Sequence, residues 1–275
     1  MHIDPEKNTA IITGGSKGIG REIARLLGRA GCRVVISGRG EEALQTTAEA
    51  FRAEGIDVLA FAGDVTVRED CRALVKKTVQ KFGGIDILIN NAGKSMRGFF
   101  ADTNLDLFQK VMDINFTGAV TMTKLCLPYI REAKGSIVFI SSVAGLKGLP
   151  AGAPYSASKM ALKSFSESLR SELKGEVHVG ILYAGFTEND AGKQKYNGKG
   201  ELIPAKRERF ASTQVDVAQA VMDMLLRRKR RTIMTLTGKL ANFAYTVFPH
   251  LSEELIIWYS QRTDMFGKDD LYKDS

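Results

Sequence analysis

The chain has 275 residues, 44% of them hydrophobic and 25% charged, which suits one large α/β domain or two small ones. Three cysteines without CxxC spacing and only three histidines argue against a disulfide framework or a metal site and favour a reducing, cytoplasmic location. The net charge of +8 is spread along the chain except for one cluster, so nucleic acid is not an expected partner.

Short β-branched runs alternate with longer segments of helical period along most of the chain. The predicted strands are residues 9–13, 33–38, 58–64, 85–91, 135–142 and 177–183. The predicted helical segments are residues 20–31, 41–55, 68–83, 105–133 and 153–173. Such alternation requires right-handed crossovers and gives a parallel sheet covered on both faces. We therefore predict one doubly wound α/β domain (a Rossmann fold) over 1–238, with a C-terminal helical extension of the same domain over 239–275.

The first predicted strand runs into a glycine-rich turn, "TGGSKGIG", which precedes a helix. Gly14, Gly18 and Gly20 permit a tight turn and a close backbone approach, and the helix N-terminus offers unpaired N–H groups to a pyrophosphate. A turn that serves packing alone would also use such residues. The position of the turn in a βαβ unit is what favours a dinucleotide site.

The residues at the end of the second predicted strand, "SGR", indicate which dinucleotide binds. An NAD site usually has an acidic residue here for the ribose 2′-hydroxyl, and this chain has none. Arg39 occupies the position and Lys17 lies inside the glycine turn, so two cations are available for a 2′-phosphate. This arrangement favours NADP(H) over NAD, although two solvent-exposed bases would look the same in sequence.

The stretch "YSASK" places Tyr155 and Lys159 four residues apart. On a helix these two side chains share one face, and a cation beside a phenol lowers the pKa of that phenol from its usual value of about 10. A tyrosine and a lysine on a solvated helix face are the alternative interpretation.

Taken together, these motifs resemble the short-chain dehydrogenase/reductase family from Thr13 to about Thr187. The matching motifs are "TGGSKGIG" at 13–20, "NNAG" at 90–93, "DINFTG" around Asn115, "ISS" at 140–142 and "YSASK" at 155–159. The interval of thirteen residues from Ser142 to Tyr155 and that of four from Tyr155 to Lys159 also match the family.

The resemblance implies a role for each of four residues. Tyr155 would act as general acid/base on the substrate oxygen, Lys159 would lower its pKa and hold the nicotinamide ribose, and Ser142 would orient the carbonyl. Asn115 would keep a water in a proton relay behind Lys159. The implied NADP(H) contacts are Gly14, Ser16, Lys17, Gly18, Ile19, Gly20, Arg39, Asp64, Val65, Asn91, Ala92, Gly93, Tyr155, Lys159, Gly185 and Thr187.

Two stretches depart from the family pattern. After the sixth predicted strand the chain reads "YAGFTEND", with Ala184 where the family commonly has proline and Asn189 near the usual threonine, so Thr187 is the nearest substitute. Many members end in a strand that leads to "DGG", whereas this chain has "RTIMTLTGKL" and then some thirty-five further residues.

The C-terminal part of the chain is expected to serve the substrate side. Residues 188–210 are polar and weakly patterned, and we predict that they form a substrate lid. After the basic cluster "RRKRR" at 227–231, apolar residues recur at near-helical period from Leu240 to Tyr259, interrupted by Pro249. We expect neither a signal peptide nor a membrane span, which needs about 20 apolar residues.

Three interpretations of this tail remain. The first expectation is that it covers the substrate cleft or a partner subunit. The alternatives are that it lies on an anionic membrane or that it forms part of the ordinary core. A homo-oligomer (dimer or tetramer) is expected, with peripheral membrane contact as a secondary possibility.

The functional expectation is an NADP(H)-dependent oxidoreductase that reduces a hydrophobic ketone, steroid-like or lipid-like. A reductase of 3-oxoacyl thioesters is the alternative within the same class. An NADP-sensing interaction protein without turnover is the alternative from a different class, and the four residues with implied catalytic roles argue against it. A nucleic-acid binder that uses the basic cluster ranks last, because no aromatic stacking platform accompanies the bases.

Overall fold

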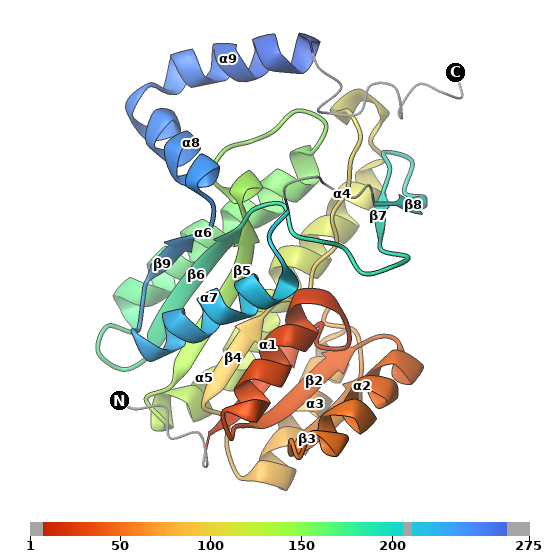
Figure 1. Ribbon diagram of the computed structural model, residues 1–275, viewed down its shortest axis with the longest axis vertical. Coiled ribbons are helices and arrows are strands. Elements are labelled where there is room, and N and C mark those ends of the chain that lie inside the picture. The colour runs from red at the N-terminus through yellow and green to blue at the C-terminus, as the bar shows by residue number, and fades with distance from the viewer. Residues whose placement is uncertain (1–7, 206–210, 263–275) are drawn as a thin grey trace.

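Seven parallel strands form the central sheet of the computed structural model, which describes residues 8–205 and 211–262 (Figure 1). The strands are β1 (Thr9–Thr13), β2 (Arg33–Gly38), β3 (Val58–Ala62), β4 (Ile87–Asn90), β5 (Ser136–Ser142), β6 (His178–Ala184) and β9 (Arg231–Ile233). Their order is β3-β2-β1-β4-β5-β6-β9, and every pairing is parallel. The chain thus winds outward from β1 in one direction and from β4 in the other, which confirms the doubly wound fold.

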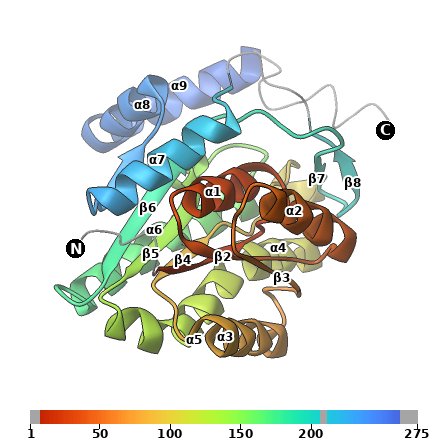
Figure 2. The ribbon, with the colours of Figure 1, turned by 60° about the horizontal axis from the view of Figure 1, so that its bottom comes forward.

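Helices cover both faces of this sheet (Figure 2). One face carries α1 (Gly18–Arg29), α2 (Glu41–Ala53) and α7 (Gln214–Leu226). The other carries α3 (Arg68–Phe82), α5 (Gly118–Glu132) and α6 (Ala153–Glu172), with α4 (Leu105–Met112) beside them. Short 3₁₀ turns lie at Phe100–Asp102 and Val143–Gly145.

Two buried layers result from the alternation of side chains along each strand. Ala10 and Ile12 of β1 belong to the layer under α1, α2 and α7, whereas Ile11 between them belongs to the layer under α3, α5 and α6. All three are fully buried. Strands covered on both faces are apolar at successive positions, which is why the sequence predicts them well.

The predicted helical stretch 105–133 is interrupted by one wider turn. α4 passes into a π-helical turn at Asp113–Thr117, and α5 follows directly. The extra residue in such a turn rotates the side chains around it, and π-turns are frequent at functional sites. This turn carries Asn115, which is buried.

Several elements were not predicted. α7 begins at a capping box, in which the Thr213 side chain accepts from the Asp216 N–H and the Asp216 side chain accepts from the Thr213 N–H. The expected lid contains an antiparallel hairpin of β7 (Gln194–Tyr196) and β8 (Leu202–Pro204). The hairpin is anchored, because the Tyr196 N–H donates to the Ser95 carbonyl at 3.1 Å. Residues 206–210 of the lid lie outside the described part.

The tail forms two helices, α8 (Leu236–Val247) and α9 (Pro249–Arg262), which stand at one end of the domain (Figure 1). The predicted break at Pro249 is confirmed, because this residue begins α9. Lys147 ties the arm to the domain through contacts with Glu253 and the Pro249 carbonyl.

The apolar face of this arm is exposed in the part of the chain that the structure describes. Phe243 is 61% exposed and Leu251 68% exposed, and Val247, Phe248, Leu255 and Trp258 are also exposed. This exposure contradicts the core interpretation of the tail for residues 236–262, whereas the other two interpretations stay predictions. None of the helices in the described ranges is long and apolar enough to cross a membrane.

Candidate active site

Tyr155 and Lys159 lie one turn apart near the start of α6. The Lys159 ammonium is 5.9 Å from the centroid of the Tyr155 ring, as the four-residue spacing predicts. Lys159 is only 5% exposed, and its Nζ donates to the Ile140 carbonyl of β5 at 2.9 Å. Burial lowers the pKa of Lys159 to about 8. The lysine is therefore held inside the protein by a strand carbonyl, with its ammonium close to the phenol.

Ser142 approaches the same phenol from the end of β5. Its hydroxyl lies near enough to Tyr155 to favour the ionised phenol. Burial raises the pKa of Tyr155 above its ordinary value, and the effect of Ser142 opposes that shift only in part. The lowered tyrosine pKa expected from the sequence is thus not found in the chain alone, because desolvation of the phenol outweighs the effects of its neighbours.

Asn115 fixes the loop that follows β4. Its Oδ1 accepts from the Lys94 N–H at 2.7 Å, and its Nδ2 donates to the Lys94 carbonyl at 3.1 Å and to Ser158 Oγ at 3.0 Å. A Cβ on Gly93 would lie 3.2 Å from Asn115 Oδ1 and 3.4 Å from Lys159 Nζ. The π-turn therefore brings the Asn115 amide and the Lys159 ammonium close to one glycine.

The glycine turn has the geometry of an anion cradle. Gly14 and Gly18 have positive φ values of 67° and 58°, and a Cβ on Gly20 would lie 2.3 Å from the Gly14 carbonyl oxygen. The Lys17 side chain makes no capping hydrogen bond to α1, whose first turn holds no acidic residue. The N–H groups of that turn are available to a phosphate, so the residues present fit a dinucleotide.

Asn91 holds this turn against β4. Its side chain donates to the carbonyls of Thr13 at 2.9 Å and Gly14 at 3.2 Å. The Thr13 hydroxyl accepts from the N–H groups of Asn91 at 3.1 Å and Ala92 at 3.0 Å. The "NNAG" motif and the glycine turn thus form one hydrogen-bonded unit.

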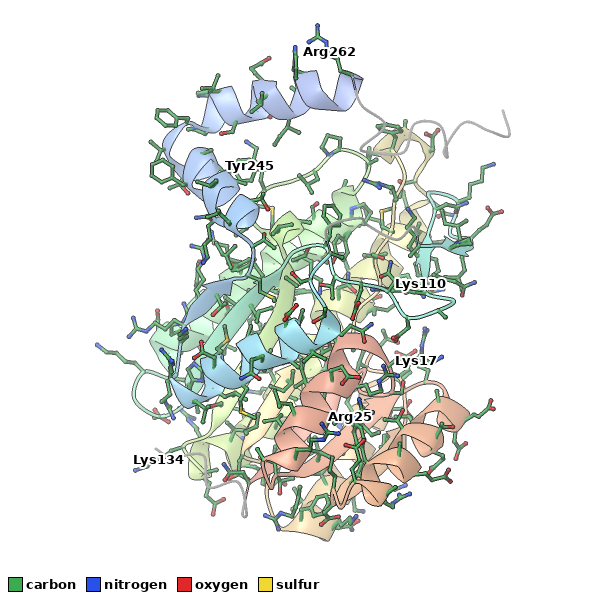
Figure 3. The ribbon with its side chains drawn as sticks, in the orientation of Figure 1. Lys17, Arg25, Lys110, Lys134, Tyr245 and Arg262 are labelled. Carbon is green, nitrogen blue, oxygen red and sulfur yellow. The ribbon has the colours of Figure 1, made fainter. Side chains whose placement is uncertain are left out.

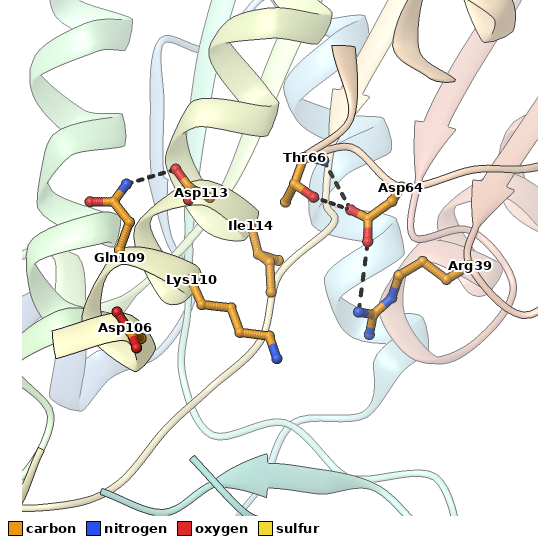
Figure 4. A pocket seen from close by; sticks show the side chains of 8 residues that line it. All are labelled: Arg39, Asp64, Thr66, Asp106, Gln109, Lys110, Asp113 and Ile114. Carbon is orange, nitrogen blue, oxygen red and sulfur yellow. Dashed lines mark hydrogen bonds and ion pairs between the residues drawn. The ribbon is translucent and has the colours of Figure 1, made fainter. Parts of the chain in front are cut away.

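A pocket opens beside the ends of β2 and β3 (Figure 4). Arg39 lines it, and its guanidinium is 3.8 Å from the Asp64 carboxylate, which also accepts hydrogen bonds from Thr66. The Arg39 side chain is 59% exposed, and Lys17 is exposed as well. Both predicted cations therefore lie at the surface, where a ligand can reach them.

The other residues with predicted cofactor contacts follow the carboxyl ends of their strands. Ser16 and Ile19 follow β1, Val65 follows β3, Ala92 follows β4, and Gly185 and Thr187 follow β6. Ligands bind at this edge in open α/β sheets. The fold thus allows these predicted contacts to serve one ligand at one edge of the sheet.

Asp190 was missed by the sequence interpretation. Its Oδ1 accepts from Gln214 Nε2 at 3.0 Å and is 3.6 Å from an Arg21 guanidinium nitrogen. Its Oδ2 lies 3.6 Å from the position that a Cβ on Gly18 would occupy. A carboxylate therefore lies next to the glycine turn, a tertiary contact for which the sequence carries no signal.

A family model described as short chain dehydrogenase matches residues 8–200. The chain belongs to the short-chain dehydrogenase family. Members of this family are oxidoreductases that act on alcohol or carbonyl groups with a nicotinamide cofactor.

Curated relatives of this short-chain dehydrogenase include plant and amoebal proteins. The 11-beta-hydroxysteroid dehydrogenase 1A of Arabidopsis thaliana is 38% identical over 196 residues, which is 70% of this chain and 56% of that protein. The dehydrogenase/reductase SDR family protein 7-like of Dictyostelium discoideum is 32% identical over 260 residues, 91% of this chain and 81% of that protein. The chain spans 56% to 60% of the length of the Arabidopsis relatives.

Solved structures share the fold. The alcohol dehydrogenase of Thermococcus sibiricus complexed with 5-hydroxy-NADP is 25% identical, with a TM-score of 0.73 over 83% of this chain and 95% of that one. A single-residue variant of the actinorhodin polyketide ketoreductase with NADPH is 28% identical, with a TM-score of 0.73 over 85% and 97%. A Burkholderia phymatum enzyme in complex with NAD has a TM-score of 0.77 over 89% and 96% at 23% identity, which shows the fold alone. Both kinds of dinucleotide occur among these neighbours.

Proposed function

We propose that this short-chain dehydrogenase is an NADP(H)-dependent reductase of a hydrophobic ketone. The observation that carries the proposal is the convergence of Tyr155, Ser142, Lys159 and Asn115 beside a glycine turn that fits a dinucleotide. Reduction of a carbonyl needs one group that donates a proton to the carbonyl oxygen and a second group that orients this oxygen by a hydrogen bond. In this proposal Tyr155 donates the proton and Ser142 makes the second hydrogen bond.

Each residue has a defined task in this proposal. The bound nicotinamide supplies the hydride, so the protein has to hold the carbonyl and deliver one proton. The Ser142 hydroxyl and the Tyr155 phenol hold the substrate oxygen, and Tyr155 donates its proton to that oxygen. The Lys159 ammonium stabilises the resulting phenolate, and Asn115 keeps the loop that carries Gly93 and Lys94 in place.

The preference for NADP(H) is supported by Arg39 and Lys17. Arg39 is available for a 2′-phosphate because its contact with Asp64 is long, at 3.8 Å, and exposed. Asp64 is in turn restrained by Thr66, so a phosphate competes with a weak ion pair rather than with a buried one.

The hydrophobic character of the substrate is supported by the surroundings of Tyr155. This ring packs against a buried cluster of Met96, Leu107, Val111 and Tyr196. The names of the Arabidopsis relatives refer to hydroxysteroids. A 3-oxoacyl thioester remains the second candidate substrate, supported by the likeness to the polyketide ketoreductase.

A substrate panel tests this proposal. The full chain is incubated with NADPH or NADH and with steroid ketones, long-chain ketones, short ketones or 3-oxoacyl thioesters, and cofactor oxidation is followed by absorbance. We expect NADPH oxidation with the bulky ketones above a Tyr155→Phe control. Oxidation no faster than in that control with every compound would contradict the proposal.

We also propose that the exposed face of α8 and α9 contacts a second copy of the chain, with peripheral membrane contact as a secondary role. This proposal is supported by the exposure of its large apolar side chains, because monomers rarely leave such a group of residues in water.

A further inference from the structure

Lys94 follows the "NNAG" motif and has a fixed backbone. Both its N–H and its carbonyl are hydrogen-bonded to the Asn115 amide, at 2.7 and 3.1 Å. The preceding residue, Gly93, is the one whose Cβ would lie 3.4 Å from Lys159 Nζ. The side chain of Lys94 therefore starts from a rigid position next to the candidate catalytic residues, although no role was predicted for it.

Tyr196 of β7 contacts both Lys94 and a second lysine. The Lys94 ammonium is 5.8 Å from the centroid of the Tyr196 ring, and the Lys110 ammonium of α4 is 5.1 Å from it. The ring is 5% exposed and is held by backbone hydrogen bonds to Ser95 and Arg97. One buried aromatic ring thus positions two ammonium groups from different elements.

These two lysines form no ion pair in the part of the chain that the structure describes. Within residues 8–205 and 211–262, the ion pairs involve other cations, Arg39 among them, and none involves Lys94 or Lys110. Burial lowers the pKa of Lys94, and although Tyr196 opposes that shift, the charge of Arg39 adds to it. Holding a half-buried cation beside another cation costs free energy unless an anion joins them.

Acidic groups are present nearby, but none of them forms an ion pair with Lys94 or Lys110 among the described residues. Asp64 contacts Arg39 and Thr66, Asp113 accepts from Gln109, and Asp190 is bound to Gln214 and Arg21. The Asp106 side chain lines the same pocket as Lys110 without an ion pair to it.

Lys110 faces the predicted cofactor site. It extends from α4 into the pocket that Arg39 and Asp64 line on the opposite side (Figure 4). In Figure 3, Lys110 lies on the same side of the molecule as Lys17 of the glycine turn. Lys110 therefore borders the pocket that holds the proposed 2′-phosphate contact Arg39, and Lys94 follows the glycine that lies next to Lys159.

We propose that Lys94 and Lys110, both held by the Tyr196 ring, bind a phosphate or carboxylate group of a ligand that lies in this cleft. The proposal rests on the proposed function for the identity of that ligand. The phosphates of the dinucleotide are the first expected source, because Lys110 shares a pocket with Arg39. An anionic group on the substrate is the other source of the same chemistry.

The test compares Lys94→Gln, Lys110→Gln and the double variant with Lys76→Gln, which removes one exposed lysine from α3. Dissociation constants of NADPH, NADH and inorganic pyrophosphate are measured by calorimetry on the full chain. Michaelis constants are measured for matched ketones with and without a carboxylate or phosphate. Thermal unfolding shows whether each variant is folded, and Lys110 is exposed enough for its single variant to remain so.

We expect the double variant to bind pyrophosphate and both dinucleotides about tenfold more weakly, as loss of charge-assisted hydrogen bonds predicts. A loss for NADPH alone assigns the lysines to the 2′-phosphate, and a rise in KM for the charged ketones alone assigns them to the substrate. Constants within about twofold of the Lys76→Gln values in every assay would overturn the proposal. Pyrophosphate binding needs no turnover, so a failure of ketone reduction leaves this test intact.

Discussion

At the scale of single residues, burial is the strongest influence on the proposed proton-transfer groups. It raises the pKa of Tyr155 and lowers that of Lys159 to about 8. Both shifts favour neutral side chains, whereas the proposed chemistry requires a phenol that can lose its proton to the substrate and an ammonium that stabilises the phenolate. The chain therefore bears a free-energy cost at this site, which is typical of sites arranged for catalysis.

This cost predicts a pH-dependent effect of Lys159→Met on stability. Because the folded-state pKa of about 8 lies below the ordinary 10.5, the unfolded chain binds more protons between these values. The wild type should therefore gain about 2 kcal/mol in free energy of unfolding relative to Lys159→Met between about pH 7 and 9.5. Denaturant unfolding of both proteins at the two pH values measures this gain. An equal difference at both pH values would mean that Lys159 is not a desolvated cation.

A second residue-scale prediction concerns cofactor choice. Arg39→Asp should remove a charge-assisted contact to the 2′-phosphate and place a second carboxylate beside Asp64. The ratio of kcat/KM for NADPH over that for NADH should fall at least about tenfold, roughly 1.4 kcal/mol. Arg52→Asp on α2 is a suitable control, because it changes the net charge equally. An unchanged ratio in Arg39→Asp would mean that Lys17, and not Arg39, accounts for the preference for NADP.

At the scale of elements, the arm of α8 and α9 is notable because its apolar face is exposed in the single chain. Tyr245 and Arg262 mark it at the end of the molecule away from Lys134 (Figure 3). In the basic cluster at 227–231, Arg231 donates to Asn242 of α8, whereas Arg228 donates to the Lys134 carbonyl at the other end of the molecule. The arm therefore carries an apolar face with Arg231 at its base.

Adding charge to this face tests what covers it. Phe243→Asp with Leu251→Glu should leave the fold and NADPH affinity unchanged, because both side chains are exposed in the single chain. We expect sizing chromatography to show an oligomer for the wild type and a smaller species for this variant, since several such side chains at roughly 25 cal/mol per Å² contribute several kcal/mol to association. Leu226→Glu, at an exposed position on α7, is the matched control. An intact oligomer that no longer binds anionic vesicles would favour the membrane instead.

At the scale of the whole molecule, sequence reasoning succeeded where a signal is local. β1 and β2 lie where their apolar runs predict them, because strands buried on both faces need no periodicity to be recognised. β9 is only three residues long, and the hairpin of β7 and β8 lies in a polar stretch, so neither has a distinctive pattern.

The residues of the candidate site also separate into those with a local sequence signal and those without one. Tyr155, Lys159 and the glycine turn are readable because their spacing within one element carries the geometry. Asp190 beside Gly18, and Lys94 beside Tyr196, depend on contacts between elements distant in sequence, which no local pattern encodes. The exposure of the arm was likewise not predictable, because periodicity identifies an apolar face but not what lies against it.

The central claim, that Tyr155 delivers the proton to a carbonyl reduced by this chain, is tested most directly by single-turnover kinetics. Wild type and Tyr155→Phe are loaded with NADPH and mixed with the best ketone from the panel, and the loss of NADPH absorbance is followed. The account predicts a rate at least about 100-fold lower in the variant, with the dissociation constant of NADPH within about twofold, as general acid catalysis of about 10² to 10⁴ requires. A rate within a few-fold of the wild type would contradict the account.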